Sequence, residues 1–347
     1  MSIEKDNSDG TGKKGNPKKL EKLFILGFFS ILLAGTPLIS QIFGAFLPVP
    51  LCMVFLIYGK RVGSLFAANI TVILLFLHSS TKVTIPPMPL MLYGLCFSLV
   101  IAELVKRKIH PITGFLTGGF SLFALLASFL LFSEFFTDFS IRGEVEKNVM
   151  NFAESFKKGP GAEALSQGGE GARRIQDIVD KPDNYVNEVM NWIPSAIFAV
   201  FFLSWWTNFY LVLRNDSVWR SSDDAYPFFL DDYVKFRVPD FCIWILILAL
   251  SLFLGGEYLL GERGVVIGVN LLIGAGVFYF FQGFGLLMDL LKQMKIVGMV
   301  RTLIFLSLIL FGVRSGFFLA FLGVLDNFKD FRKSFKKKNN EDEGDNL

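Results

Sequence analysis

Apolar residues along this chain come in long runs, and short polar segments separate these runs from one another. Runs of roughly 18 to 25 residues, the length that crosses about 30 Å of hydrocarbon as a helix, occur at 23–40, 42–59, 63–79, 87–105, 111–133, 192–213, 239–258 and 264–291, and a longer one at 297–326. Helix-length apolar runs favour helices that span a bilayer. The pattern therefore predicts an all-α fold, a polytopic transmembrane helical bundle.

Lysine and arginine predict how these segments are oriented, because cytoplasmic loops of membrane proteins carry an excess of both. Basic clusters near the N-terminus, at 60–61, at 106–108 and in the tail FKDFRKSFKKK fall on one side if the spans alternate. A cytoplasmic tail then requires an even number of crossings, which the break GVRSG at 312–316 supplies. We expect about eight to ten membrane segments, ten in the preferred topology, with N-in and C-in ends. A single tilted helix over 297–326 is the alternative, and it places the basic tail outside.

The same pattern divides the chain into five regions. We expect a disordered cytoplasmic tail at 1–22, an N-terminal membrane bundle of five segments at 23–133, an extracytoplasmic amphipathic loop at 134–191, a C-terminal membrane bundle at 192–326, and a basic then acidic cytoplasmic tail at 327–347.

Two amphipathic stretches are expected within the 134–191 loop. Apolar residues recur at helical spacing first at Val145, Val149, Phe152 and Phe156, and again around Ile175, Ile178 and Val179, where Pro182 ends the pattern. Such a pair would lie on the membrane surface or cap a cavity. A linker with two weakly ordered helices is the alternative.

Composition supports a membrane protein and argues against other classes. Hydrophobic residues make up 52% of the 347, charged residues 19%, and the mean hydropathy is +0.51; soluble domains are about 25% charged. The net charge of +3 gives no global electrostatic support for a nucleic-acid partner. The expected partner is the lipid bilayer, and the expected location is the bacterial cytoplasmic (inner) membrane. The three cysteines lie inside apolar runs and are expected to be buried and unpaired.

Sequence signals of catalysis are nearly absent. The two histidines, His78 and His110, belong to no recognised motif, and no HExxH, GxSxG or phosphate-binding loop occurs in its structural context. We therefore predict that the protein is not an enzyme and that it carries no metal or other cofactor.

Polar side chains inside the apolar runs are the better candidates for function, since each is costly in a bilayer and tends to face protein or water. The candidate solute-facing residues are Asn69, Asn208, Asn270, Gln282 and Asp289. The last two are seven residues apart and share one helix face. The alternative for Asp289, which the sequence favours, is an interfacial ion pair with Lys292, and the favoured alternative for Gln282 is hydrogen bonding between helices. Glu103 is expected to pair with the cations at 106–108. Four glycines near Gln282, namely Gly274, Gly276, Gly283 and Gly285, predict a packed helix interface.

Several segments resemble the YybS-like family of bacterial membrane proteins, which is classed as a domain of unknown function. They are LPVPLCMVFLIYGKRVGSLFA, NFYLVLRN, FRVPDFCIWILIL, NLLIGAGVFYFFQGFGLL and FLGVLDNFKDFRK, and together the resemblance covers most of residues 23–335. The family implies no activity. At the level of fold, the first half is also similar to the S-components of energy-coupling-factor transporters, although these usually have six spans.

Two functions are compatible with these observations. One is a small-solute binding or transport subunit, similar to a transporter S-component and dependent on a partner protein for energy. It predicts a polar cavity lined by residues such as Asn69, Asn208, Asn270 and Gln282. The alternative is a non-transporting membrane scaffold or regulatory protein that acts through its loop and tail, and it predicts a dry, packed bundle.

Overall fold

The computed structural model describes residues 17–81, 87–158, 170–220, 226–296, 298–329 and 331, and all regular structure within these ranges is helical. The chain divides into two compact units. Unit 1 comprises Met1–Ile109 with Thr207–Pro227, and unit 2 comprises His110–Trp206 with Phe228–Leu347. The sequence analysis predicted two membrane bundles, at 23–133 and 192–326, separated by the 134–191 region. The sequence reading missed that one long helix, α9 (Pro182–Arg214), contributes residues to both units.

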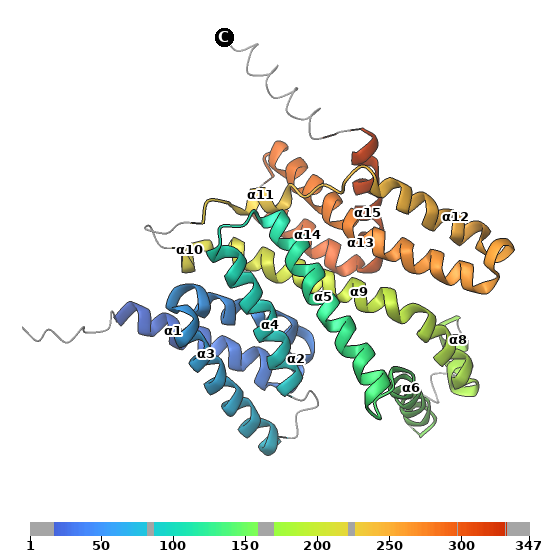
Figure 1. Ribbon diagram of the computed structural model, residues 1–347, viewed down its shortest axis with the longest axis horizontal. Coiled ribbons are helices and arrows are strands. Elements are labelled where there is room, and N and C mark those ends of the chain that lie inside the picture. Colours follow the sequence, from blue (N-terminus) through green and yellow to red (C-terminus); the bar gives the residue numbers. More distant parts are fainter. Residues whose placement is uncertain are drawn as a thin grey trace, which may run out of the picture. The chain divides into compact units, whose positions relative to one another are not determined.

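Unit 1 is built on a short N-terminal hairpin and two longer helices (Figure 1). Its elements are α1 (Pro17–Gly35), α2 (Pro37–Phe43), the 3-10 turn η1 (Gly44–Phe46), α3 (Pro48–Thr81), α4 (Pro87–Lys106), the end of α9, and α10 (Asp216–Trp219). Several of these helices begin at proline, whose missing N–H is not needed in a first turn. Small residues let α1 approach α3, since Gly27 lies against Phe66 and Gly35 against Leu74.

A sharp break divides α3 at Gly59. Its φ of +82° is a conformation that glycine adopts without the steric penalty of a Cβ. Gly63, four residues after the break, lies so close to the ring of Phe55, four residues before it, that a Cβ there would collide with the ring. The chain therefore folds back at Gly59, between the two spans predicted at 42–59 and 63–79.

Unit 2 contains the remaining helices, and closely apposed backbones hold several of them together. Its elements are α5 (Pro111–Phe136), α6 (Ile141–Lys158), α8 (Glu170–Asp180), most of α9, α11 (Leu230–Val234), α12 (Cys242–Leu260), α13 (Glu262–Gln293), α14 (Met299–Phe311) and α15 (Val313–Phe328). α12 and α13 form a hairpin at Gly261 and lie side by side (Figure 1). Gly256 and Gly264 meet there with no room for a Cβ on either.

α13 and α15 make the second close approach. A Cβ built on Gly283 would collide with the carbonyl of Leu319, and one on Gly323 with the carbonyl of Tyr279. The expected packed interface therefore exists at Gly283, and Gly285 is buried. A Cβ built on Gly274 would make only ordinary contact with Phe198, and one built on Gly276 would meet no atom of another helix within 4 Å. These two glycines do not serve helix packing, contrary to the prediction.

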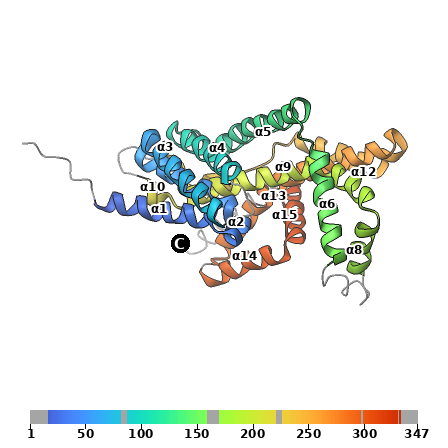
Figure 2. The same ribbon diagram turned by 90° about the horizontal axis from the view of Figure 1, so that it is seen from below.

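The region predicted as a loop at 134–191 is largely helical. α5 continues to Phe136, and Pro182 is the first residue of α9, so it starts a helix in addition to following the end of α8. α6 and α8 lie side by side (Figure 2). Their buried residues include Val149 and Val179, whereas Phe152, predicted on the same stripe, is 44% exposed. Residues 159–169 lie outside the described part of the chain.

Within the described ranges, six helices are long and apolar enough to cross a membrane: Gly44–Ser79, Met88–Lys106, Pro111–Phe136, Pro182–Arg214, Cys242–Leu260 and Glu262–Gln293. There are seven if α14 and α15, which are bent by 105°, form one broken span. The all-α, multi-pass class is confirmed. The count is below the expected ten because α3 counts as one element, the run at 23–40 is shared between α1 and α2, and the run at 297–326 breaks at Gly312.

The expected tails are covered only in part. α1 begins at Pro17, so residues 17–22 are helical and do not belong to a tail. Residues 1–16, 330 and 332–347 lie outside the described ranges.

Candidate functional site

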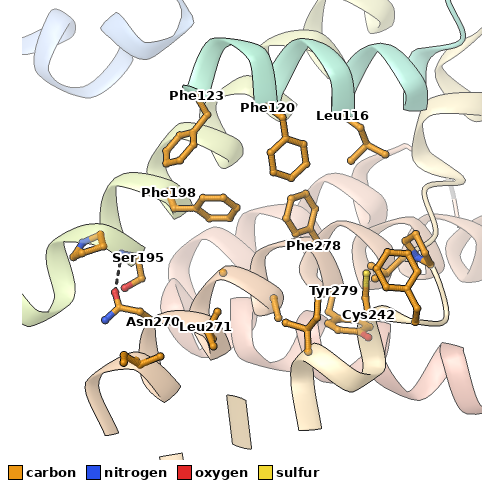
Figure 3. Close-up of a pocket in the computed structure, with 18 of the residues that line it drawn as sticks. Leu116, Phe120, Phe123, Ser195, Phe198, Cys242, Asn270, Leu271, Phe278 and Tyr279 are labelled. Carbon is orange, nitrogen blue, oxygen red and sulfur yellow. Dashed lines mark hydrogen bonds between the residues drawn. The ribbon is translucent and has the colours of Figure 1, made fainter. Parts of the chain in front are cut away.

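Unit 2 contains a pocket of about 960 Å³ between α5, α9, α12, α13 and the segment 236–241 (Figure 3). Aromatic and aliphatic side chains form most of its wall. The lining residues are Leu116, Phe120, Phe123, Met190, Asn191, Pro194, Ser195, Phe198, Phe236, Val238, Pro239, Phe241, Cys242, Ile245, Val266, Ile267, Asn270, Leu271, Gly274, Ala275, Phe278 and Tyr279.

Phenylalanine rings from three helices face one another across this pocket. Phe120 and Phe123 come from α5, Phe198 from α9 and Phe278 from α13 (Figure 3). The rings of Phe120 and Phe278 are stacked with centroids 5.9 Å apart, and those of Phe123 and Phe198 meet edge to face at 5.2 Å. Such arrangements are preferred by the ring quadrupoles. They give this side of the pocket a defined shape.

A fully buried aromatic core supports the phenylalanine wall. Phe115 meets Phe281 edge to face at 5.3 Å, and its carbonyl accepts a hydrogen bond of 2.9 Å from the indole N–H of Trp205. Gly119 lies against Trp205 and Phe202, and a Cβ there would be 2.9 Å from each ring. The α5–α9 contact is therefore tight, and we expect the wall to move little.

Asn270 lies at one end of the pocket and completes the backbone of a neighbouring helix. Pro194 lies inside α9 and has no N–H to donate along the helix. Asn270 bonds to two backbone groups close to this proline, those of Asn191 and Ser195. The Ser195 N–H donates to Asn270 Oδ1 at 2.9 Å (Figure 3), and Asn270 Nδ2 donates to the Asn191 carbonyl at 2.8 Å. Nδ2 also donates to the Val266 carbonyl at 2.8 Å. The carboxamide is thus fully used by protein groups.

Gln282 is fully buried but does not line the pocket; it holds part of the rim. Its Oε1 accepts a 2.8 Å hydrogen bond from the N–H of Val238, in the lining segment 236–241. Its Nε2 donates to Asp326 Oδ2 at 3.0 Å and to Asn327 Oδ1 at 2.9 Å, both on α15. Asp326, itself 1% exposed, also accepts from the Phe331 N–H at 3.2 Å. This arrangement corresponds to hydrogen bonding between elements, the second of the two interpretations given for Gln282.

The other three predicted site residues do not line the pocket. Asn69 is exposed and donates to the Leu65 carbonyl of its own helix at 2.9 Å. Asn208 is buried in unit 1, where it donates to the Ala45 carbonyl at 2.9 Å and to the Tyr93 hydroxyl at 3.2 Å. Asp289 is half-buried on α13. Of the five candidates only Asn270 lines this pocket, so the polar cavity predicted around Asn69, Asn208 and Gln282 is not the cavity found here.

Glu103 makes the ion pair that was predicted for it. Its Oε1 lies 2.6 Å from Arg107 Nε, as expected from the neighbouring cluster, and its Oε2 lies 2.8 Å from Lys60 Nζ. Lys292 Nζ lies 2.5 Å from Asp231 Oδ2, and its pairing with Asp289 stays a prediction. A partner far away in the sequence could not be read from local spacing.

Phenylalanines form the wall of the pocket, which the sequence analysis did not predict. The chain has 40 of them, and inside a continuous apolar run nothing distinguishes a ring that faces a cavity from one that faces lipid. As for metals, no group of three or more His, Cys, Asp or Glu side chains that could hold an ion occurs among the described residues.

Fold and pocket together define a multi-pass helical membrane protein with an apolar pocket in one of its two units. The chain belongs to the family described as "predicted membrane protein (DUF2232)", which it matches over residues 23–327. No curated protein and no solved structure matches it. The family description names no activity, and the YybS-like name and the likeness to transporter S-components stay predictions.

Proposed function

We propose that this protein is a membrane-embedded binding or transport subunit whose ligand is a lipid-like apolar molecule held in the pocket of unit 2. The observation that carries the proposal is the pocket of about 960 Å³, walled by aromatic and aliphatic side chains. Ligand sites in proteins measure about 300 to 1,000 Å³ and are mostly apolar. Helices that can cross a membrane form its walls, so an apolar molecule dissolved in the bilayer could enter from the side.

The polar groups of the lining favour an apolar ligand over a polar one. Asn270 is already bonded to the Ser195 N–H and the Asn191 carbonyl, and the Ser195 hydroxyl donates to the Trp192 carbonyl. A polar solute placed here would find few groups left to replace its hydration, which costs several kcal/mol per unpaired group. An apolar ligand that arrives from lipid gains little from the hydrophobic effect. Its affinity would come from close packing against the phenylalanine rings, so selectivity should follow shape.

Transport, if it is the purpose of binding, would need a second protein. The sequence carries no nucleotide-binding motif, so we propose that an energising membrane partner supplies the driving force. The proposal assigns no catalysis to this chain and places it in the bacterial cytoplasmic membrane.

Filling the pocket tests the proposal. Gly274 lines the cavity and a Cβ there meets only Phe198, at 3.8 Å, so Gly274→Leu should occupy ligand space without a backbone clash. Gly276→Leu adds the same side chain to the same helix, at a position with no other residue within 4 Å and outside the lining. The proteins would be extracted with native lipid into polymer nanodiscs, and retained small molecules identified by mass spectrometry. We expect one apolar species to be enriched in the wild type and in Gly276→Leu and to be lost in Gly274→Leu. Equal retention in all three would overturn the proposal.

The scaffold alternative is favoured by the exposed apolar side chains of α6. Met150 and Phe152 are 38% and 44% exposed, although α6 already packs against α8. If the protein is a scaffold, the Met150→Ser, Phe152→Ser double variant should be inactive in the cell. The Gly274→Leu variant should then stay active. The opposite result supports ligand binding.

A further inference from the structure

We propose that the end of unit 1 where the α3 break meets the last turn of α4 binds the headgroup of an anionic phospholipid. Five basic residues define this basic end: Lys60, Arg61, Lys106, Arg107 and Lys108. The site is separate from the pocket of unit 2, and its argument does not depend on the proposed function.

The break at Gly59 brings the two halves of the basic end together. It places Lys60 and Arg61 at the point where α3 folds back, while Arg107 directly follows α4. Glu103 joins the two, because its carboxylate lies 2.8 Å from Lys60 Nζ and 2.6 Å from Arg107 Nε. Cations that are distant in the sequence are thereby held side by side.

The charge of this end is strongly positive and open to the surroundings. All five basic residues are exposed, and the side chains of Lys60 and Arg107 are 67% and 68% accessible. Glu103 is the one carboxylate of this group and balances a single charge. It also orients two of the cations before any ligand arrives, which lowers the entropy lost on binding. The segments 60–61 and 103–108 together carry five basic residues and one carboxylate, so their net charge of +4 attracts an anion.

Exposed apolar side chains begin next to these cations. Val62 follows Arg61 directly and is 39% exposed, Leu65 is 66% exposed, and Leu99, one turn before Glu103 on α4, is 42% exposed. A phospholipid matches this arrangement, with a phosphate for the cations and acyl chains for the apolar side chains. A soluble anion would leave the apolar side chains uncovered. The distribution of basic residues also predicts that this end faces the cytoplasm, where anionic lipids attract polybasic segments.

Native mass spectrometry of the full chain, in micelles that contain equal amounts of phosphatidylglycerol and phosphatidylcholine, tests the inference. The main variant is Arg61→Gln with Lys106→Gln, chosen because both ion pairs of Glu103 stay intact. The matched control is Arg173→Gln, which removes an exposed cation of α8 in unit 2. We expect the wild type and the control to retain phosphatidylglycerol preferentially. The double variant should lose roughly 25-fold in that preference, since each cation near an anionic surface contributes about a factor of five.

Three results would overturn the inference. Equal retention of the two lipids by the wild type would show that there is no anionic site, and an unchanged preference in the double variant would place the site elsewhere. Displacement of phosphatidylglycerol by millimolar glycerol 3-phosphate would show that phosphate alone is recognised, without the apolar side chains. Helix content by circular dichroism checks that the double variant is folded. If it is not, Arg61→Gln alone should lower the preference about fivefold.

Discussion

Both ends of the Gln282 carboxamide are occupied, its oxygen by the Val238 N–H and its nitrogen by Asp326 and Asn327. Asn270, on α13, likewise bonds to a backbone group of α9, and Asn208 donates to the carbonyl of Ala45. These side chains replace hydrogen bonds that water would provide outside a membrane. In hydrocarbon the alternative is an unsatisfied backbone group, and this explains why the bundle tolerates them.

Replacement of Gln282 by leucine should destabilise unit 2 and loosen the pocket rim. The change leaves the Val238 N–H and the Asp326 carboxylate without this partner, at about 1–3 kcal/mol per orphaned buried group. We expect a lower midpoint of thermal unfolding in detergent and reduced retention of the pocket's ligand. Asn69→Leu is the control, because Asn69 is exposed and bonds only within its own helix; its effect should stay within about 0.5 kcal/mol. Equal midpoints for the two variants would contradict this assignment.

A double-mutant cycle can measure the energetic coupling between Asn270 and Pro194. Asn270→Leu alone should destabilise the fold, since the Ser195 N–H and the Asn191 carbonyl lose their partner. Pro194→Ala allows α9 to close its own backbone hydrogen bonds, so the asparagine becomes dispensable. We expect a coupling energy of about 1–3 kcal/mol between the two positions, measured by denaturant unfolding. Additive effects would argue against the bridge.

At the scale of elements, backbone conformation and close approach can be separated by glycine substitutions. Gly59→Ala introduces a Cβ that meets no other atom within 4 Å, so its whole effect comes from the φ of +82°. We expect a loss of about 1–2 kcal/mol. Gly276→Ala, in an open helical position, should be neutral or stabilising by up to about 1 kcal/mol. The midpoints of thermal unfolding of the two single variants test this prediction. An unchanged midpoint for Gly59→Ala would contradict the positive φ at Gly59.

The interface of α13 with α15 depends on glycine for a different reason. Gly283→Val places atoms where the Leu319 carbonyl already lies, so the two helices must separate. Because Gln282 reaches α15 from the adjacent position, separation also breaks its bonds to Asp326 and Asn327. We expect a marked loss of folded protein on size-exclusion chromatography, with Gly276→Val as the control. Equal yields would mean that α15 packs less closely than described.

The extent of each element was predictable where local chemistry marks both ends. α4 was expected at 87–105 and runs from Pro87 to Lys106, because a proline opens it and a basic cluster closes it. The start of α9 was missed because Pro182 was taken only as the end of a helix, although proline also suits a first turn.

The pocket could not be predicted from the sequence. Phe120 lines it and Phe129 does not, and the two occupy indistinguishable positions in one apolar run.

On the scale of the whole molecule, the distribution of basic residues predicts that both termini are cytoplasmic and that the α6–α8 region is outside. A reporter fused after Lys338 should therefore be active in the cytoplasm, and one inserted at Asn184 outside it. The 105° bend between α14 and α15 is compatible with two short segments that enter and leave on the same side. A reporter at Lys338 that is active outside the cell would contradict this topology and favour a single crossing in 297–326.

The Asn270 bridge constrains how the pocket could ever open. Its carboxamide joins two backbone groups of α9 to the α13 backbone at Val266, so a sliding movement of one helix along the other would break all three bonds at once. Rotation about this point would keep them. We therefore expect any opening of the pocket to be a rotation of α9 relative to α13 about Asn270, with no sliding of one helix along the other.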